Sequence, residues 1–135
     1  MRPTFRCNLL LLLVTLLTIG GCGAPKAPYK VVPFEGTITF KGKPLENVSL
    51  QFAVGDYRPS GAFVKEGEGG KFKATHTTSQ QGIPVGKCTL TVVWGSDSDP
   101  PAEYKELFSK YGAEGSSAYV FDVTKAEKTF KIELE

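Results

Sequence analysis

The feature that most constrains this 135-residue chain is a run of Leu, Val, Thr and Ile from Leu9 to Ile19, which is followed by two glycines and Cys22. Arg2 and Arg6 precede the run, so its layout is that of a cleavable secretory signal. Eleven residues reach about 16 Å as a helix, which is about half the thickness of a bilayer's hydrocarbon core. The run therefore predicts a signal peptide over residues 1–21 and argues against a membrane-spanning helix.

The end of this segment, Ile19-Gly20-Gly21-Cys22, resembles the lipobox of bacterial lipoproteins, in which the cysteine takes a diacylglyceryl group before cleavage. The resemblance implies that Cys22 is lipidated and that the protein is held to a membrane through this lipid. Two or more acyl chains anchor a protein stably, because each buried methylene contributes about 0.8 kcal/mol. An ordinary secretory signal that is cut near Cys22 is the alternative that the sequence leaves open.

Cleavage after residue 21 also decides the charge and size of the remaining chain. It removes two of the 16 basic residues and none of the 14 acidic ones, so the mature chain is neutral. A neutral chain without a basic cluster offers no footprint for nucleic acid, and we exclude that partner class. We expect a lipidated cysteine and Pro-rich tether over residues 22–33 and one domain over residues 34–135.

The cysteines restrict how this domain is stabilised. Cys7 leaves with the signal peptide and Cys22 takes the lipid, so Cys88 has no partner for a disulfide within the chain. Cys88 shares strand parity with Leu90 and Val92, which predicts a small buried hydrophobe, with a reactive thiol as the alternative. The fold must therefore be held by packing.

From Gly36 onward, short alternations of apolar and polar residues are separated by turn residues, which predicts β-strands. Residues 37–40 and 48–52 are expected to form a hairpin or near-hairpin around the sequence Lys41-Gly42-Lys43-Pro44. Thr89 and Thr91 are expected to point outward from the longest strand. Further strands are expected at 62–64, 71–75, 87–94, 119–123 and 130–134, and a buried core is expected from Ile38, Phe40, Leu50, Phe52, Phe72, Leu90, Val92, Phe121, Ile132 and Leu134.

Residues 102–111 are the only stretch with helical spacing. Their apolar members, Tyr104, Leu107, Phe108 and Tyr111, recur at intervals of three and four, and Gly112 follows. This stripe is expected to cap an open end of the fold or, alternatively, to offer a partner contact through Tyr104, Phe108 and Tyr111. The whole pattern predicts an all-β, antiparallel β-sandwich of seven strands (six to eight), with one short helix between the last strands.

The stretch from Gly36 to Val48, followed by Gly70-Lys71-Phe72 and by Ile83-Pro84-Val85-Gly86-Lys87, resembles a family of β-sandwich domains. This is the carboxypeptidase regulatory-like, or transthyretin-like (prealbumin-like), domain of bacterial surface lipoproteins. Lys110-Tyr111-Gly112 and Ser116-Ser117-Ala118-Tyr119 are similar to the closing segment of that lipoprotein type. The motifs consist of turn and strand-entry residues, so the resemblance implies a fold, a Greek-key β-sandwich, and no chemistry.

The chain departs from this family at several positions. Cys88 stands where the family often has a tyrosine, and Lys65-Glu66-Gly67-Glu68 replaces the usual approach to the next strand. The transthyretin-related hydroxyisourate hydrolases carry several histidines and a different C-terminus. Here His76 is the only histidine and the sequence ends Ile132-Glu133-Leu134-Glu135, which argues against that activity.

Other chemistry is weakly supported. His76 has no second imidazole near it in sequence and is expected to be an exposed or hydrogen-bonded loop residue. Asp97, Asp99 and Glu103 supply fewer oxygens than the six to eight that calcium takes, and aspartates that open turns explain them. The sequence contains no Gly-x-Ser-x-Gly motif. We therefore expect no catalytic residues, no metal and no cofactor.

Two functions follow as expectations. The first is a lipid-anchored, non-enzymatic module of the bacterial cell envelope that faces the periplasm or the exterior, as a binding or spacer domain with an envelope protein as a possible partner. The second is a carbohydrate- or small-ligand-binding domain that uses exposed aromatics. For glycan binding, Tyr57, Tyr104 and Tyr111 should lie on one exposed face. The sequence leaves the oligomeric state open.

Overall fold

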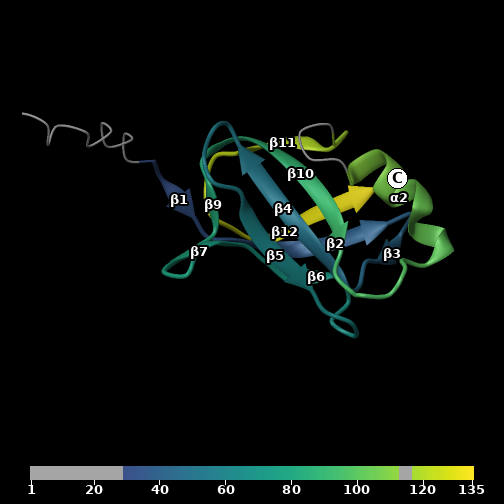
Figure 1. Ribbon diagram of the computed structural model, residues 1–135. Helices are drawn as coiled ribbons and strands as arrows, with labels where there is room; N and C mark the ends of the chain where they lie inside the picture. The colour runs from purple at the N-terminus through teal and green to yellow at the C-terminus, as the bar shows by residue number, and fades with distance from the viewer. Residues whose placement is uncertain (1–28, 113–116) are drawn as a thin grey trace, which may run out of the picture.

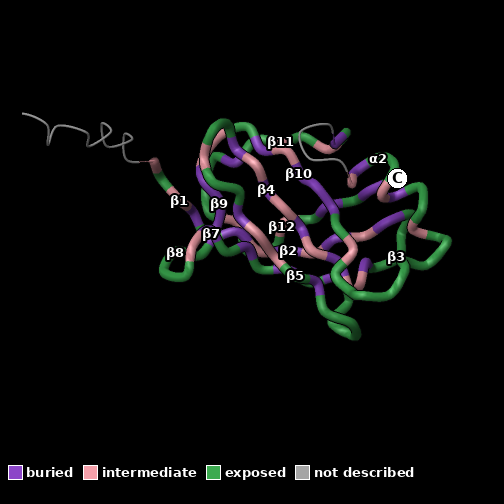
Figure 2. The backbone as a smooth tube through the Cα atoms, in the orientation of Figure 1, coloured by how far each residue is buried: buried purple, intermediate pink, exposed green. Residues whose placement is uncertain are grey.

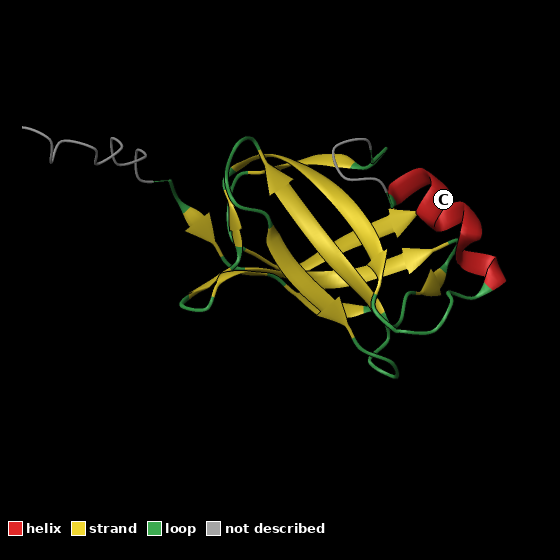
Figure 3. Cartoon of the chain, in the orientation of Figure 1, coloured by secondary structure: helices red, strands yellow, loops and turns green. Residues whose placement is uncertain are grey.

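The computed structural model describes residues 29–112 and 117–135, and the predicted signal peptide and Cys22 lie outside these ranges. Most of the described chain is β-structure, with one short helix (Figures 1 and 3). The elements are β1 (Val31–Val32), β2 (Phe34–Phe40), β3 (Lys43–Pro44), β4 (Val48–Val54), β5 (Ser60–Val64), β6 (Lys71–Lys73), β7 (Thr75–Thr77), β8 (Gln80–Gln81), β9 (Ile83–Pro84), β10 (Gly86–Trp94), the 3₁₀-helix η1 (Ala102–Tyr104), α2 (Lys105–Tyr111), β11 (Val120–Val123) and β12 (Glu127–Leu134).

The strands form two main sheets that enclose the core. One sheet has the order β11-β10-β4-β5-β7-β8, and the other has the order β12-β2-β3 with β6 also paired to β2. A third, two-stranded sheet joins β1 to β9. Four of the twelve strand segments have only two residues, and the remaining eight have three or more. The expectation of an all-β sandwich is confirmed.

The core lies between the two sheets, and buried residues alternate with half-buried ones along β2 and β4 (Figure 2). Nine of the ten expected core residues are buried, while Phe121 is half-buried because β11 is an edge strand. Phe34 was not predicted. Its ring lies 4.9–6.2 Å, between centroids, from four other rings, those of Phe52, Phe72, Phe121 and Phe130.

The expected hairpin between residues 37–40 and 48–52 is wrong. Strand β2 turns back only into the short β3, and β4 belongs to the other sheet, where it pairs with β10 and β5. Lys41 and Gly42 both have positive φ, 50° and 80°, as a two-residue hairpin turn requires. Beyond β3, Leu45 is 1% exposed in the core, and Asn47, with φ of 55°, redirects the chain into the second sheet.

The expectation of a wholly antiparallel sandwich also needs correction. Strand β12 pairs parallel to β2, in a register that places Ile132 opposite Ile38. The chain crosses between the sheets after β11, and the backbone N–H of Glu127 then donates to the carbonyl of Pro33 at 2.9 Å. Because β12 begins beside the start of β2, the two strands run in the same direction.

Two smaller expectations are also wrong. Residues 71–75 are not one strand, because Ala74 separates β6, which pairs with β2, from β7, which pairs with β5 in the other sheet. Thr91 does not point into solvent and is only 3% exposed. Strand β10 is an interior strand with α2 packed against it, so its middle has little exposed surface on either face.

The sandwich has two distinct ends. At the end that we call the tether end, β1 pairs with β9 and the N–H of Val85 donates to the carbonyl of Lys30 at 2.9 Å. Lys30 and β1 fall in the range 22–33 that the sequence assigns to the tether, so the last part of that range is fastened to the sandwich. At the opposite end, the helix end, η1 and α2 cover the C-terminal ends of β2, β10 and β12 (Figure 1). Within residues 29–112 and 117–135, no helix is long and apolar enough to span a bilayer.

Candidate functional site

The helix predicted over residues 102–111 is present, as one turn of 3₁₀-helix followed by α2. Leu107 is fully buried and Tyr111 is 5% exposed, so these two side chains cap the sandwich. The Tyr111 hydroxyl donates to the backbone carbonyl of Glu135 at 3.0 Å, which fixes the end of β12 to the helix. The capping role expected for the stripe is therefore confirmed for Leu107 and Tyr111.

Tyr104 and Phe108 are only half-buried. Together with Trp94 they form an aromatic trio with edge contacts between centroids of 6.0–6.4 Å. The indole N–H of Trp94 donates to the carbonyl of Ser98 at 2.7 Å, which holds the ring against the following loop. Of the three predicted partner contacts, Tyr104 and Phe108 keep accessible surface, whereas Tyr111 is committed to the core.

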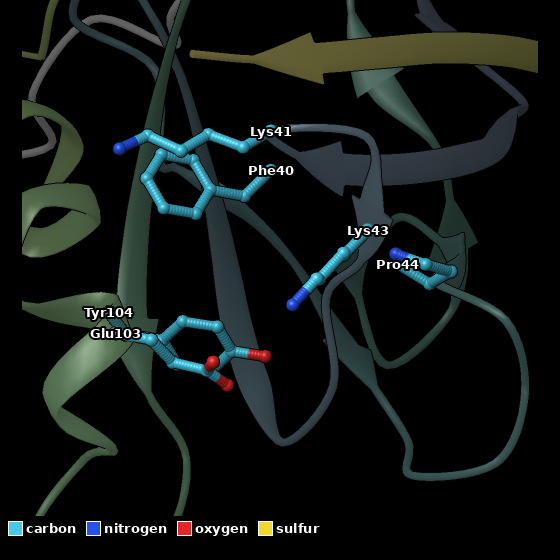
Figure 4. A pocket seen from close by; sticks show the side chains of 6 residues that line it. All are labelled: Phe40, Lys41, Lys43, Pro44, Glu103 and Tyr104. Atoms are coloured by element: carbon cyan, nitrogen blue, oxygen red, sulfur yellow. The ribbon is translucent and has the colours of Figure 1, made fainter.

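A cleft of about 330 Å³ lies beside this trio, between the β2–β3 turn and η1 (Figure 4). Pro44 forms part of the turn wall, and the Lys43 ammonium group extends from that wall toward the opposite one. Glu103 and Tyr104 form the opposite wall (Figure 4). The cleft therefore carries basic groups on one side and an acid and a phenol on the other.

The charges of the cleft are only partly paired. Lys41, which also lines the cleft, forms an ion pair with Glu106. Its Nζ lies 5.2 Å from the centroid of the Phe40 ring. The hydrogen bond from Lys41 lowers the pKa of Glu106. Among the described residues, Lys43 and Glu103 form no ion pair. Lys43 could therefore bind an anionic group of a ligand, and Glu103 a cationic one.

The same surroundings raise the pKa of the Tyr104 phenol. Burial raises its pKa, and the charges of Glu103 and Glu46 raise it further. The phenol therefore stays protonated at neutral pH and can donate a hydrogen bond into the cleft. The cleft is suited to holding a small ligand.

The tether end contains a hydrogen-bonded set that the sequence did not predict. His76 is buried, at 3% exposed, with Nε2 2.6 Å from the hydroxyl of Tyr29 and Nδ1 2.9 Å from the hydroxyl of Ser60. The expectation of a hydrogen-bonded residue holds, but the expected loop position and the exposed alternative are wrong, because His76 lies in β7 and is buried. His76 shares strand parity with Phe72 and Ala74, both buried, and this is the signal that would have placed it inward.

This set joins the tether to the fold. The Tyr29 ring also stacks on Tyr57, at 4.3 Å between centroids, and meets the imidazole edge-on at 5.4 Å. Burial lowers the pKa of His76, and the nearby charge of Arg58 lowers it further, so the imidazole is neutral at pH 7. Ser60 is 1% exposed, which leaves its hydroxyl inaccessible to a substrate. The arrangement fastens Tyr29, and with it the end of the tether, to the sandwich.

The three tyrosines considered for glycan binding do not share one face. Tyr57 lies at the tether end, where it stacks on Tyr29. Tyr104 and Tyr111 lie at the helix end, and Tyr111 is buried. The common platform that this alternative requires is therefore not formed.

The remaining candidates sit as follows. Cys88 is fully buried, and burial raises the pKa of its thiol to about 12, so it is an unreactive part of the core. Asp97, Asp99 and Glu103 belong to the loop and helix at the helix end. Within the part of the chain that the structure describes, no group of three or more His, Cys, Asp or Glu residues could hold a metal ion. Cys22 lies outside the described residues.

Comparison of the chain with known proteins found no matching family model, no matching curated protein and no matching solved structure.

Proposed function

We propose that the protein is a lipid-anchored, non-enzymatic β-sandwich module of the bacterial cell envelope, which acts as a binding or spacer domain at a set distance from the membrane. The proposal includes the finer architecture implied by the sequence resemblance, a Greek-key sandwich of the transthyretin-like, carboxypeptidase regulatory-like type. Its sequence support is the predicted signal peptide that ends at Cys22.

One structural observation carries the proposal. The chain enters the fold at the tether end, where Tyr29 and β1 are fastened, while the cleft and the aromatic trio lie at the helix end. A lipid on Cys22 would therefore hold the tether end toward the membrane. The helix end would then face an envelope partner, with Tyr104 and Phe108 as its contacts.

Processing of Cys22 is tested in cells with a labelled fatty acid. The Cys22→Ala variant should lose the label and accumulate as uncleaved precursor. Cys7→Ala is the matched control, because it removes another cysteine of the same predicted leader and should be labelled and cleaved normally. Normal cleavage and membrane retention of Cys22→Ala would overturn the proposal.

A second candidate, a small-ligand-binding domain, is favoured by the cleft at the helix end. Its unpaired Lys43 and Glu103 lie on opposite walls beside the ring of Tyr104, so a small zwitterion with an apolar body suits it best. A screen of amino acids, short peptides and sugars by ligand-observed NMR tests this function. Binding that Lys43→Gln abolishes and Lys65→Gln leaves intact would support it, and a screen without binders would contradict it.

A further inference from the structure

The charges of the described residues are distributed unevenly along the sandwich. At the helix end, residues 39–49, 64–70, 91–112 and 132–135 carry five basic and nine acidic side chains. At the tether end, residues 29–36, 51–60, 72–88 and 121–130 carry six basic and four acidic side chains. Lys71 and Lys131 lie at mid-length. The half that contains the tether is therefore positive and the half that contains the helix is negative.

Three exposed lysines lie together on the outer face of the sheet formed by β12, β2 and β6. Lys71 and Lys131 lie opposite Thr37 on the two neighbouring strands, so they flank it in one row across the sheet. Lys128 lies near them on β12, beside the register shift between Glu127 and Phe130. These three exposed lysines, which we call the basic face, surround a shallow cleft of about 370 Å³.

Two acidic residues near the basic face are paired with other lysines. Glu35 pairs with Lys73 at 3.3 Å, and Glu127 lies 3.8 Å from Lys125. Among the described residues, none of the three lysines of the basic face takes part in an ion pair. Their ammonium groups are free to meet an anionic surface, and their aliphatic stems can lie along its apolar margin.

The position of the proposed anchor indicates which anionic surface the basic face meets. Six residues lie between Cys22 and Tyr29, so the two are at most about 25 Å apart when the chain is fully extended. A domain held this closely cannot move far from the lipid headgroups, and lysines near an anionic bilayer are attracted to it. We propose that the basic face docks on the anionic headgroups of the membrane in which the protein is anchored. This inference rests on the proposed lipid anchor.

The test uses the lipidated full-length product purified from cells and reconstituted in vesicles. Amine-reactive footprinting with mass spectrometry compares each lysine in vesicles that contain phosphatidylglycerol with the same lysine in purely zwitterionic vesicles. We expect labelling of Lys71, Lys128 and Lys131 to fall at least about threefold in the anionic vesicles, and to recover at high salt. Lys65 and Lys105 at the helix end should be unchanged.

The same experiment separates docking from simple tethering. Lys87 lies at the tether end but on the other sheet, so its labelling should stay constant if the sheet face docks. Lys128→Glu combined with Lys131→Glu should abolish the protection of Lys71. Lys65→Glu combined with Lys105→Glu is the matched control with the same change in net charge, and it should preserve that protection.

Two results would overturn the inference. One is uniform labelling in anionic and zwitterionic vesicles, and the other is protection of Lys71 that appears only in native membranes, which would indicate an acidic envelope polymer or protein. In both cases, protein that still floats with the vesicles would leave the lipid anchor intact. Failure of the anchor is seen separately, as protein that does not float with zwitterionic vesicles.

Discussion

The two ends of the sandwich are closed by different physical means. At the helix end, apolar side chains of α2 are buried against the outlets of the strands, and Leu107 is fully covered. At the tether end, polar atoms add to buried apolar residues such as Val32 and Ile83, with the imidazole of His76 bridging two hydroxyl groups. Burial of apolar surface is insensitive to pH, whereas an imidazole changes its charge near neutrality. The end that holds the tether should therefore be the more pH-dependent one.

The largest effect is expected at the helix end. Leu107→Ala should lower the free energy of unfolding by about 2–5 kcal/mol, because it opens a cavity under a fully buried side chain. Urea denaturation measures this loss. Lys105→Ala, on the exposed side of the same helix, is the control and should change stability little. A small effect of Leu107→Ala would show that α2 does not close this end.

At the tether end, Tyr29→Phe should cost about 1 kcal/mol, because the hydroxyl bonded to His76 is lost while the ring can still stack on Tyr57. Tyr57→Phe removes the same atom from the stacking partner and serves as the control, with a smaller expected loss. Denaturation of both variants in parallel gives the difference. Equal effects would argue against the hydrogen-bonded fastening.

The stability of the tether end is also expected to depend on pH. The pKa of His76 is lowered in the fold from its ordinary value of 6.5, so the unfolded chain binds the proton more readily. The contribution of neutral His76 is complete above about pH 6.5 and is lost as the pH falls through 6.5 toward the lowered value. Unfolding measured from about pH 7.5 to 5.5 should show declining stability.

A control variant assigns that decline to its source. His76→Gln lacks a titrating group, and its stability, although lower overall, should depend less on pH over the same range. Leu107→Ala should keep the full pH dependence of the original chain. A His76→Gln variant with an unchanged slope would place the titration at another group.

The smallest effect concerns the ion pair between Lys41 and Glu106 at the helix end. Both side chains are more than half exposed, at 54% and 60%, so solvent screens the pair. Lys41→Gln should leave the melting temperature unchanged within error, as measured by circular dichroism. A clear drop would mean that the exposed pair, as well as Leu107, holds the helix in place.

The strands, most of the core and the helix could be predicted from the sequence. Alternation of apolar residues located the strands and nearly all of the expected core, because a half-buried strand has a period of two. Spacings of three and four placed the helix and its buried Leu107. Both signals are local, and the structure confirms them.

The errors concern long-range pairing. The turn residues Lys41 and Gly42 are compatible with a return of β2 into β3 or into β4. The burial of Leu45 directly after β3 distinguishes the two pairings. The parallel pairing of β12 with β2 depends on where the chain crosses between the sheets. The fastening joins Tyr29 to His76 across 47 residues, and the cleft joins β3 to η1, so neither could be found from local patterns.

We propose that a lipid on Cys22 holds the tether end at the membrane, so that the aromatic trio at the helix end stays outside the bilayer. Trp94 is the only tryptophan of the chain and lies at the helix end, so its fluorescence reports that end alone. The measurement is quenching of this fluorescence by brominated lipids, for lipidated protein that floats with the vesicles. We expect emission that does not change with bromine content, and strong quenching of Trp94 in the floated protein would contradict this placement of the helix end.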